Sequence, residues 1–450
     1  MPITFLLERF HAFGSDDAIV WNDQAFTYDW LRQRVVHWID EVRHHGIAEG
    51  RVVVVEADFS PNAIAVLLAL IQTRAIIVPL TRGMIRQKHE FMEIAAPEMS
   101  IELGSDDTAT IGATGRTLST HPMYDVVRTA QHPGLVLFSS GSTGKSKAAL
   151  HDLSGILRKF HTPRHRLRTI SFLLYDHIGG LNTLLYTLSN GGCLVTVNDR
   201  SPDAVFAAVE KHRVELLPTS PTFLNLALLS EAYRAHNISS LRTISYGTEA
   251  MPESTLKRLV ALFPSVSFLQ TYGLSETGIL RSKSKESGSL FMKIGGEGFQ
   301  TRIVDGLLQI KAESAMVGYL NAPSPFTDDG WFKTGDAVEV DGDYIRILGR
   351  TSDIINVGGE KVYPAEVESV IGELPDIAEA TVYSERHPLI GQIVCATVTP
   401  LKHADTDAKE LVTIVKRHCA TRLPPFKIPI KIRVVSDVQH TQRFKKARAV

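Results

Sequence analysis

Short apolar runs alternate with helical patterns along the first half of this 450-residue chain. Val52–Val55 is typical of a buried strand, Pro61–Gln72 has the pattern of an apolar helix, and Ala75–Pro79 is a second strand-like run. A strand–helix–strand unit of this kind favours a parallel sheet with helices on both faces. The pattern therefore predicts an α/β fold built around mostly parallel sheets.

The same alternation continues through the middle of the chain and changes after about residue 290. We predict strands at Thr169–Leu174, Cys193–Val197, Leu241–Ser245 and Val266–Leu269. We predict helices that start near Gly180 and that cover Val205–His212 and Pro252–Phe263. Further on, the alternating runs predict a small antiparallel section, at Thr301–Val304, Leu307–Lys311 and Tyr344–Leu348.

The length of the chain requires more than one domain, because 450 residues exceed one ordinary hydrophobic core. The pattern changes again near residues 349–352. Beyond that point a helix at Pro364–Ile371 and a strand at Ala380–Val382 predict a last βα-type region. We therefore predict a large N-terminal domain over residues 1–349, with an antiparallel subdomain, and a small α+β C-terminal domain over residues 350–450.

Composition and charge exclude several classes of protein. Hydrophobic residues at 44% and charged residues at 22% are typical of a globular chain, and the net charge of -1 offers no general attraction to nucleic acid or anionic membranes. Cys193, Cys395 and Cys419 form no C-x-x-C pair, which argues against a disulfide framework or a zinc site. The start has no signal-peptide pattern, and no apolar stretch approaches the length of a membrane span. We expect a cytoplasmic protein with no nucleic-acid partner and no membrane span.

An apolar run, Leu135–Phe138, ends abruptly in a loop rich in Ser, Thr and Gly that continues to Lys147. Such a loop combines backbone N–H groups, hydroxyls and positive charge, which together bind phosphate oxygens. The loop ends like a Walker A motif, at residues 144–146, but that motif requires a glycine where this chain has Ser139. A P-loop NTPase is therefore disfavoured.

The spacing of this loop resembles the phosphate loop of the adenylate-forming superfamily, which includes acyl-CoA synthetases, aryl-acid ligases, luciferases and peptide-synthetase adenylation domains. The residues that carry the resemblance, and that would bind ATP, are Ser140, Gly141, Ser142, Thr143, Gly144 and Lys147. Ser146 stands where the family usually has proline. The resemblance implies a large ATP- and acyl-binding domain followed by a small mobile domain with a catalytic lysine.

A second segment, Thr271–Gly278, resembles the family's Y-G-x-[ST]-E motif. By this likeness Tyr272 and Gly273 belong to the adenine site, Glu276 coordinates Mg²⁺ and Thr277 contacts the α-phosphate. One carboxylate suffices, because Mg²⁺ takes its other oxygen ligands from phosphates and water. Without the resemblance the segment would be a strand-end turn with a solvated glutamate. The family segment that runs along adenine is matched upstream by Gly247, Thr248 and Glu249.

Two more segments resemble the family's W-x-x-T-G-D and G-R pattern, which binds ribose. Asp336 would accept hydrogen bonds from the ribose diol, and Arg350 would donate one. The residues that follow resemble the family's hinge, where Ser352 replaces the usual Asp or Lys. In the next loop Gly358 and Gly359 would line the entry path of a thiol, since glycines let the backbone approach a pantetheine arm closely.

The C-terminal run resembles the family's T-x-x-G-K-x-x-R motif. Thr441, Lys445 and Arg448 keep its spacing, whereas Phe444 replaces the glycine. Lys445 is the candidate catalytic lysine, which in the family reaches the carboxylate and the α-phosphate, and Lys446 is its only local competitor. On composition alone, a basic terminus of this kind is a solvated tail.

The resemblance implies an ATP-dependent carboxylic acid ligase. The carboxylate attacks the α-phosphate of ATP and pyrophosphate leaves. The resulting acyl-AMP transfers its acyl group to a thiol, either of CoA or of the phosphopantetheine on an acyl or peptidyl carrier protein. The expected cofactors are therefore ATP, Mg²⁺ and that thiol, and the expected partner is a small carboxylic acid.

The identity of the acid depends on residues 173–181, which match the family's acyl pocket. His177 resembles the H-x-x-G-L form of acyl and aryl ligases and is a third candidate catalytic residue, whereas Asp176 could hold the amino group of an amino acid. We favour an apolar or aromatic acid, with an amino-acid-activating enzyme as the alternative. A non-catalytic nucleotide- or acyl-binding relative is a further alternative, which the departures at Ser146, Ser352 and Phe444 motivate.

Overall fold

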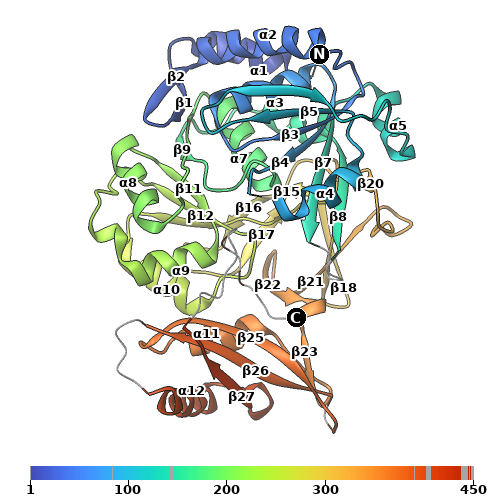
Figure 1. Ribbon diagram of the computed structural model, residues 1–450. Coiled ribbons are helices and arrows are strands. Elements are labelled where there is room, and N and C mark those ends of the chain that lie inside the picture. Colours follow the sequence, from blue (N-terminus) through green and yellow to red (C-terminus); the bar gives the residue numbers. More distant parts are fainter. Residues whose placement is uncertain are drawn as a thin grey trace.

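A computed structural model describes residues 2–83, 85–140, 145–389, 391–401, 407–436, 444 and 446 (Figure 1). The large N-terminal domain contains two seven-stranded sheets and a six-stranded antiparallel sheet, and the small C-terminal domain has its own five-stranded sheet. The predicted α/β fold with an antiparallel section and a small final domain is therefore confirmed. The boundary after residue 349 stays a prediction.

The first seven-stranded sheet contains the predicted strand–helix–strand unit. β3 (Val52–Glu56) and β4 (Ile76–Leu80) pair in parallel, and α3 (Pro61–Gln72) connects them. The Ser60 hydroxyl accepts a hydrogen bond from Ala63 N and so caps α3, whose side chains are mostly buried. The other strands of this sheet are β5 (Met99–Leu103), β6 (Ala109–Ala113), β7 (Gly134–Ser140), β8 (Ser146–Asp152) and β20 (Gly318–Tyr319). The pairs β5–β6, β7–β8 and β8–β20 are antiparallel, so this sheet is mixed rather than mostly parallel.

The second seven-stranded sheet is parallel except at its edge, where β1 and β2 pair antiparallel. In spatial order its strands are β13 (Ser267–Gln270), β12 (Thr243–Tyr246), β11 (Leu216–Thr219), β9 (Arg168–Ile170), β10 (Cys193–Val195), β1 (Asp17–Trp21) and β2 (Gln24–Thr27). The predicted strand Thr169–Leu174 is thus shorter than expected. The chain leaves the sheet after Ile170 because a helix begins at Ile178 and the intervening residues must turn toward it.

Helices cover the sheets of the large domain and connect their strands. They are α1 (Thr4–Phe13), α2 (Tyr28–His44), α4 (Ile85–Ala95), α5 (Pro122–Ala130), α6 (Leu153–Leu157), α7 (Ile178–Ser189), α8 (Pro202–His212), α9 (Pro221–Ser230) and α10 (Glu253–Leu262). Side chains from α1, α2, α3 and α7 pack with strand residues in one large hydrophobic core. This core holds the two seven-stranded sheets together, as burial of apolar surface favours.

The predicted antiparallel section is a six-stranded sheet, and its expected strands all lie in it. Its strands are β16 (Arg281–Ser284), β17 (Met292–Gly295), β22 (Tyr344–Arg350), β21 (Phe332–Asp341), β19 (Leu307–Ala312) and β18 (Phe299–Val304). A two-stranded hairpin, β14 (Gly273–Leu274) with β15 (Gly278–Ile279), precedes the sheet.

The small domain follows the short η3 helix (Thr351–Asp353). Its sheet contains β23 (Ile355–Val357), β24 (Glu360–Val362), β25 (Ile377–His387), β26 (Gly391–Pro400) and β27 (Lys431–Val434), and its helices are α11 (Pro364–Ile371) and α12 (Ala408–Arg422). The predicted strand Ala380–Val382 is the centre of the longer β25, because β25 pairs with β26 almost along its whole length. Side chains of α11 and α12 form the core of this domain with the sheet.

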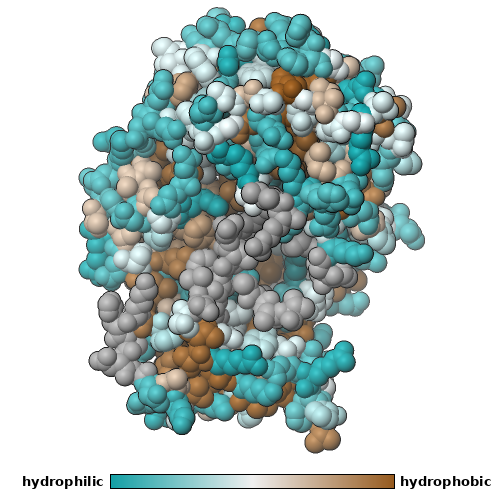
Figure 2. Space-filling model, in the orientation of Figure 1, coloured by the Kyte–Doolittle hydropathy of each residue, from teal (hydrophilic) through white to brown (hydrophobic). Residues whose placement is uncertain are grey.

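The small domain lies below α9 and α10 of the large domain in the view of Figure 1. Asn225 Nδ2 donates to Ala378 O at 2.9 Å, and Ser254 Oγ donates to Ser369 O at 3.1 Å. Figure 2 shows mostly hydrophilic residues over this face of the large domain, so the apolar side chains are concentrated inside. Among the described residues, no helix combines the length and apolar character that crossing a membrane requires.

Candidate functional site

Three strands of the second sheet bring predicted site segments to one edge. β11, β12 and β13 are parallel and in register, so the residues that follow them lie side by side. These residues are Ser220, Gly247 and Thr271. The carboxyl ends of parallel strands are the usual position of ligand sites in α/β proteins. The edge therefore joins the predicted adenine segment to the predicted motif at Thr271–Gly278.

The loop of residues 275–277, which we call the Glu276 loop, is held by three hydrogen bonds from the large domain. His151 Nε2 donates to Ser275 O at 2.5 Å, Met316 N donates to Glu276 O at 2.7 Å, and Ser314 Oγ donates to Thr277 O at 2.7 Å. His151 is fully buried, and burial lowers its pKa, so the ring is neutral near pH 7. Three consecutive carbonyls are therefore satisfied from the core, which fixes the direction of the side chains.

The carboxylate of Glu276 lies beside a tyrosine and a lysine. Tyr319 Oη donates to Glu276 Oε1 at 2.7 Å, and Lys147 Nζ lies 5.2 Å from the centroid of the Tyr319 ring. Burial, together with the neighbouring Glu276, raises the pKa of Tyr319, so its hydroxyl stays protonated and can donate. Sequence reasoning missed Tyr319, which lies in a two-residue strand that no local pattern marks. The structure thus brings the end of the phosphate loop to the Glu276 loop.

The donor set around Glu276 fits a magnesium ion that takes most of its ligands from a nucleotide. Among the described residues, no group of three or more His, Cys, Asp and Glu side chains could hold a metal. Mg²⁺ commonly binds one or two carboxylates and completes its shell with phosphates and water. Glu276 satisfies that requirement, since Tyr319 contacts only its Oε1 in the described part of the chain. Thr277 Oγ1 is buried nearby without a hydrogen-bond partner among the described residues.

The far end of the phosphate loop is anchored at Ser146. Gly141, Ser142, Thr143 and Gly144 lie outside the described residues, and Ser140 ends β7 opposite Ser146 in β8. Ser146 N and Oγ donate to the two oxygens of Glu90 at 3.2 and 3.3 Å, and Ser146 O accepts from Asn321 Nδ2 at 2.8 Å. A proline at this position would have neither donor. The chain therefore uses this departure from the family pattern to tether the loop to α4.

The predicted ribose pair, Asp336 and Arg350, lies across two strands. The two residues are register partners in β21 and β22, and Arg350 Nε lies 3.4 Å from Asp336 Oδ1. Tyr272 Oη donates to Asp336 Oδ2, so the residue predicted for adenine also contacts the residue predicted for ribose. Asp336 is 5% exposed, and this burial raises the pKa of its carboxyl group, which the charge of Arg350 opposes.

The segment predicted to run along adenine has a close backbone approach at Gly247. A Cβ there would lie 2.6 Å from Thr271 Oγ1 and 2.7 Å from Thr271 O, so the position accepts only glycine. Thr248 follows with a positive φ of 73°. The carboxylate of Glu249 has partners within the protein: it accepts hydrogen bonds from Thr222 N at 2.8 Å and from Lys446 N at 3.1 Å.

His177 and Asp176 have structural partners in the acyl region. His177 is the N-cap of α7, and its Nδ1 accepts from Gly179 N at 3.1 Å. Asp176 is buried and accepts from Thr81 Oγ1 at 3.4 Å. A Cβ on Gly180 would lie 2.0 Å from Leu174 O, which explains the glycines after His177. His177 therefore caps α7, and this structural role does not depend on a contact with an acid.

The predicted hinge and thiol-path residues lie on the surface. Ser352 is exposed in η3, and its hydroxyl donates to Asp353 Oδ1 at 2.9 Å. Gly358 and Gly359 form the turn between β23 and β24, with φ of 59° and 96°. A Cβ on either glycine would meet no described atom within 4 Å, so the turn is open for a binding partner.

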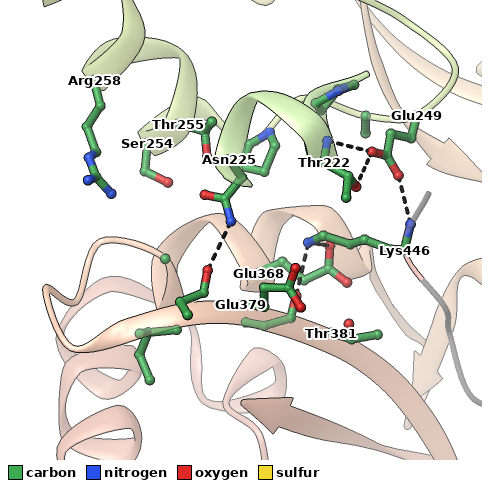
Figure 3. A pocket seen from close by; sticks show the side chains of 17 residues that line it. Thr222, Asn225, Glu249, Ser254, Thr255, Arg258, Glu368, Glu379, Thr381 and Lys446 are labelled. Atoms are coloured by element: carbon green, nitrogen blue, oxygen red, sulfur yellow. Dashed lines mark hydrogen bonds and ion pairs between the residues drawn. The ribbon is translucent and has the colours of Figure 1, made fainter. Parts of the chain in front are cut away.

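Lys445, the candidate catalytic lysine, lies outside the described residues, as do Thr441 and Arg448. Its neighbours Phe444 and Lys446 are described. Ser220 Oγ donates to Phe444 O at 2.8 Å, and Lys446 Nζ lies 2.8 Å from Glu368 Oε2 of α11 (Figure 3). The end of the chain therefore reaches the same sheet edge as the predicted adenine segment.

Comparisons with known proteins match both domains. A family model described as AMP-binding enzyme matches residues 85–306, and one described as AMP-binding enzyme C-terminal domain matches residues 366–445. A feruloyl-CoA synthase of Amycolatopsis sp is 27% identical over 447 residues, which cover 90% of this chain and 89% of the synthase. The two models together cover more than half of the chain.

Two further similarities agree with these matches. An indoleacetate–CoA ligase of Aromatoleum aromaticum is 28% identical over 337 residues, 69% of this chain, and the match spans only 65% of the ligase. Among solved structures, the anthranilate CoA ligase AuaEII in complex with anthranoyl-AMP superposes with a TM-score of 0.81, over 98% of this chain and 95% of that chain. At 18% identity this likeness shows a shared fold.

Proposed function

Because the chain belongs to the adenylate-forming superfamily of AMP-binding enzymes, we propose that it ligates a carboxylic acid to the thiol of CoA at the expense of ATP. The observation that supports this best is the cluster of Lys147, Tyr319 and Glu276, which joins the end of the phosphate loop to the Glu276 loop. A cation beside a carboxylate that, among the described residues, accepts a hydrogen bond at one oxygen suits a magnesium–triphosphate group.

The reaction has two steps. In the first, a carboxylate oxygen forms a bond to the α-phosphorus of ATP while the bond from that phosphorus to the bridging oxygen breaks, and pyrophosphate leaves with the electron pair. In the second, the thiol sulfur attacks the acyl carbon, the bond to the AMP oxygen breaks, and the thiol proton passes to solvent. Since the first step brings two anions together, catalysis consists mainly of positioning and charge neutralisation.

We assign the neutralising charges to three sources. Lys147 and Lys445 supply ammonium groups, and Glu276 would hold Mg²⁺, which when bound would neutralise charge on the phosphates. The Thr277 hydroxyl, buried and without a partner among the described residues, would donate to the α-phosphate. Such preorganised donors act without reorganisation during the reaction, and removing one typically costs roughly 10²–10³ in rate.

The remaining assignments concern nucleotide and thiol. Asp336 would accept from the ribose diol, with Arg350 beside it, and Tyr272 would present its ring to adenine while its hydroxyl holds Asp336. Ser352 would serve as the hinge on which the small domain turns between the two steps. Gly358 and Gly359 form a turn that the described chain leaves uncovered, which supports their role in the thiol path.

We favour an aromatic acid as the substrate. Two of the relatives are named for ferulate and indoleacetate, which are aromatic carboxylates. Asp176, which accepts from Thr81 Oγ1, is the residue that would hold the amino group if the substrate were an amino acid.

Exchange of labelled pyrophosphate into ATP tests the proposal directly. The assay is run with ferulate, indoleacetate, anthranilate, a long-chain fatty acid and a set of amino acids, and then for thioester formation with CoA or with a phosphopantetheine-loaded carrier protein. The proposal expects exchange that depends on an aromatic acid, and thioester with CoA. Exchange with amino acids alone would reassign the substrate, and release of phosphate without exchange, or no exchange at all, would reject the function.

A further inference from the structure

Phe444 and Lys446, the last described residues, contact both domains. The ring of Phe444 packs against the large domain: its centroid lies 5.3 Å from that of Phe172 and 5.8 Å from that of Phe223, with Arg200 Cζ at 5.4 Å. Phe172 and Phe223 are fully buried in the core of that domain. The ring of Phe444 is therefore held by two aromatic rings and a guanidinium group of the large domain.

The side chain of Lys446 is bound to the small domain instead. Its Nζ lies 2.8 Å from Glu368 Oε2 on α11 and donates to Ala380 O on β25 at 3.0 Å. Glu368 is 4% exposed, and its other oxygen accepts from Val382 N at 2.9 Å. Removal of the ammonium would leave a buried carboxylate with one partner fewer, which is costly.

The backbone of these two residues completes the connection. Ser220 Oγ donates to Phe444 O at 2.8 Å, and Lys446 N donates to Glu249 Oε2 at 3.1 Å. Ser220 and Glu249 both belong to the carboxyl edge of the second sheet. Phe444 thus binds the large domain through its ring, and Lys446, two positions later, binds the small domain through its ammonium group.

Phe444 has a backbone conformation that suits glycine. Its φ is 52°, in the left-handed region where a side chain is disfavoured. The family motif has glycine at this position, so the chain keeps the conformation and adds a ring. A bulky residue persists in such a conformation when its surroundings hold it, and the Phe172–Phe223–Arg200 pocket is what holds this one.

The rest of the domain interface is polar and partly hollow. Figure 3 shows Thr222, Asn225 and Glu249 of the large domain above Glu368, Glu379 and Thr381 of the small domain, with Lys446 crossing between them. Polar interfaces of this kind resemble those of transient complexes, so the domains can separate. The contacts of Phe444 and Lys446 add to the hydrogen bonds of Asn225 and Ser254 in holding this arrangement.

We infer that Phe444 and Lys446 form a C-terminal clasp that holds the small domain on the large one during adenylation and opens for the thiol step. This inference rests on the proposed function, because the candidate catalytic Lys445 lies between the two residues in the sequence. Phe444 is in this account a positioning residue. Its ring makes contacts with the large domain that the glycine of the family motif cannot make.

Two variants test the clasp through the separate half-reactions. Phe444→Gly keeps the positive φ and removes the ring, and Lys446→Gln removes the ammonium from Glu368. Each should lower acyl-AMP formation from ATP at least about tenfold. The aromatic and cation–π contacts of Phe444 are worth ~1.4 kcal/mol, one factor of ten, and a buried carboxylate that loses its ammonium partner costs more. Thioester formation from supplied acyl-AMP should keep its rate. The matched control is Lys427→Gln, which breaks an ion pair to Glu366 of the same helix, within the small domain.

Hydrogen exchange gives a readout that does not depend on activity. In the free protein, exchange over residues 220–225 and 377–381, which face each other across the interface, should rise in both variants and stay unchanged in Lys427→Gln. Unchanged exchange in both clasp variants, or equal losses in the two half-reactions together with a lower melting temperature, would overturn the clasp. A wild-type protein that forms no acyl-AMP would reject the proposed function, while the exchange result would still decide whether the clasp exists.

Discussion

The Glu276 loop and the C-terminal clasp are held in different ways. The loop has three consecutive carbonyls bonded to His151, Met316 and Ser314, all within the large domain. The clasp contacts two domains at once: the large domain through the ring of Phe444 and two backbone hydrogen bonds, and the small domain through the ammonium group of Lys446.

The geometry of the loop is set when the large domain folds, whereas the geometry of the clasp is set when the small domain docks on the large one. A loop satisfied from a buried core has its geometry before any substrate binds, which is the condition for electrostatic preorganisation. A segment shared between domains has its geometry only while they are docked, which suits a group needed in one step and not in the next. Substitutions in the loop and in the C-terminal segment should therefore have different effects.

Within the large domain, the largest effect is expected from Glu276. Glu276→Gln keeps the size of the side chain and removes the charge assigned to Mg²⁺, so acyl-AMP formation should fall roughly 10²-fold. The unfolding free energy should barely change, because the backbone bonds of the loop do not involve the carboxylate. Pyrophosphate exchange across a Mg²⁺ titration measures it. Glu297→Gln, at an exposed glutamate paired with Arg281, is the control. Wild-type kinetics in Glu276→Gln would remove the residue from the site.

A smaller effect is expected from the ribose residue. Asp336→Ala removes the acceptor for the diol, and a lost hydrogen bond to a charged group is worth about 1.5–3 kcal/mol. The dissociation constant of ATP should therefore rise at least about tenfold, measured by calorimetry on the variant. Asp341→Ala on the same strand, whose carboxylate pairs with Lys285 at the surface, should leave ATP affinity unchanged. Equal affinity in Asp336→Ala, with normal folding, contradicts the assignment.

The smallest effect concerns the support of the Glu276 loop. Burial lowers the pKa of His151 in the folded protein, so below about pH 6.5 the unfolded chain binds the proton more readily. Its contribution to stability is therefore present above that pH and is lost as the pH falls, with a slope of at most about 1.4 kcal/mol per pH unit. Urea unfolding between pH 7.5 and 5 should show this slope in the wild type and a shallower one in His151→Gln. Equal slopes in the wild type and the variant would mean that His151 does not titrate as a buried base.

Most of the fold was predictable because its elements are local and periodic. The helices Pro61–Gln72 and Pro364–Ile371 begin and end where their patterns predict, since proline and capping residues mark their starts. β9 was overestimated because an apolar run does not show where a chain leaves a sheet. The antiparallel pairs of the first sheet were missed because pairing direction depends on partners that are distant in sequence.

The site was predictable only where a motif carries it. Tyr319 was missed because its position beside Glu276 comes from the pairing of a two-residue strand with β8. The bonds of Ser146 to Glu90 join residues 56 positions apart, and no spacing rule indicates them. In the sequence, Phe444 is only a departure from a motif, because its ring contacts Phe172 and Phe223, which are far from it along the chain. These residues all depend on tertiary packing.

We propose that the reaction centre is assembled from a part fixed in the large domain and a part brought by the small domain. Measuring both half-reactions in Lys445→Ala tests this most directly. Acyl-AMP formation from ATP should fall by roughly 10²–10³-fold, while thioester formation from supplied acyl-AMP should keep the wild-type rate. Equal losses in the two half-reactions, or no loss in either, would contradict it.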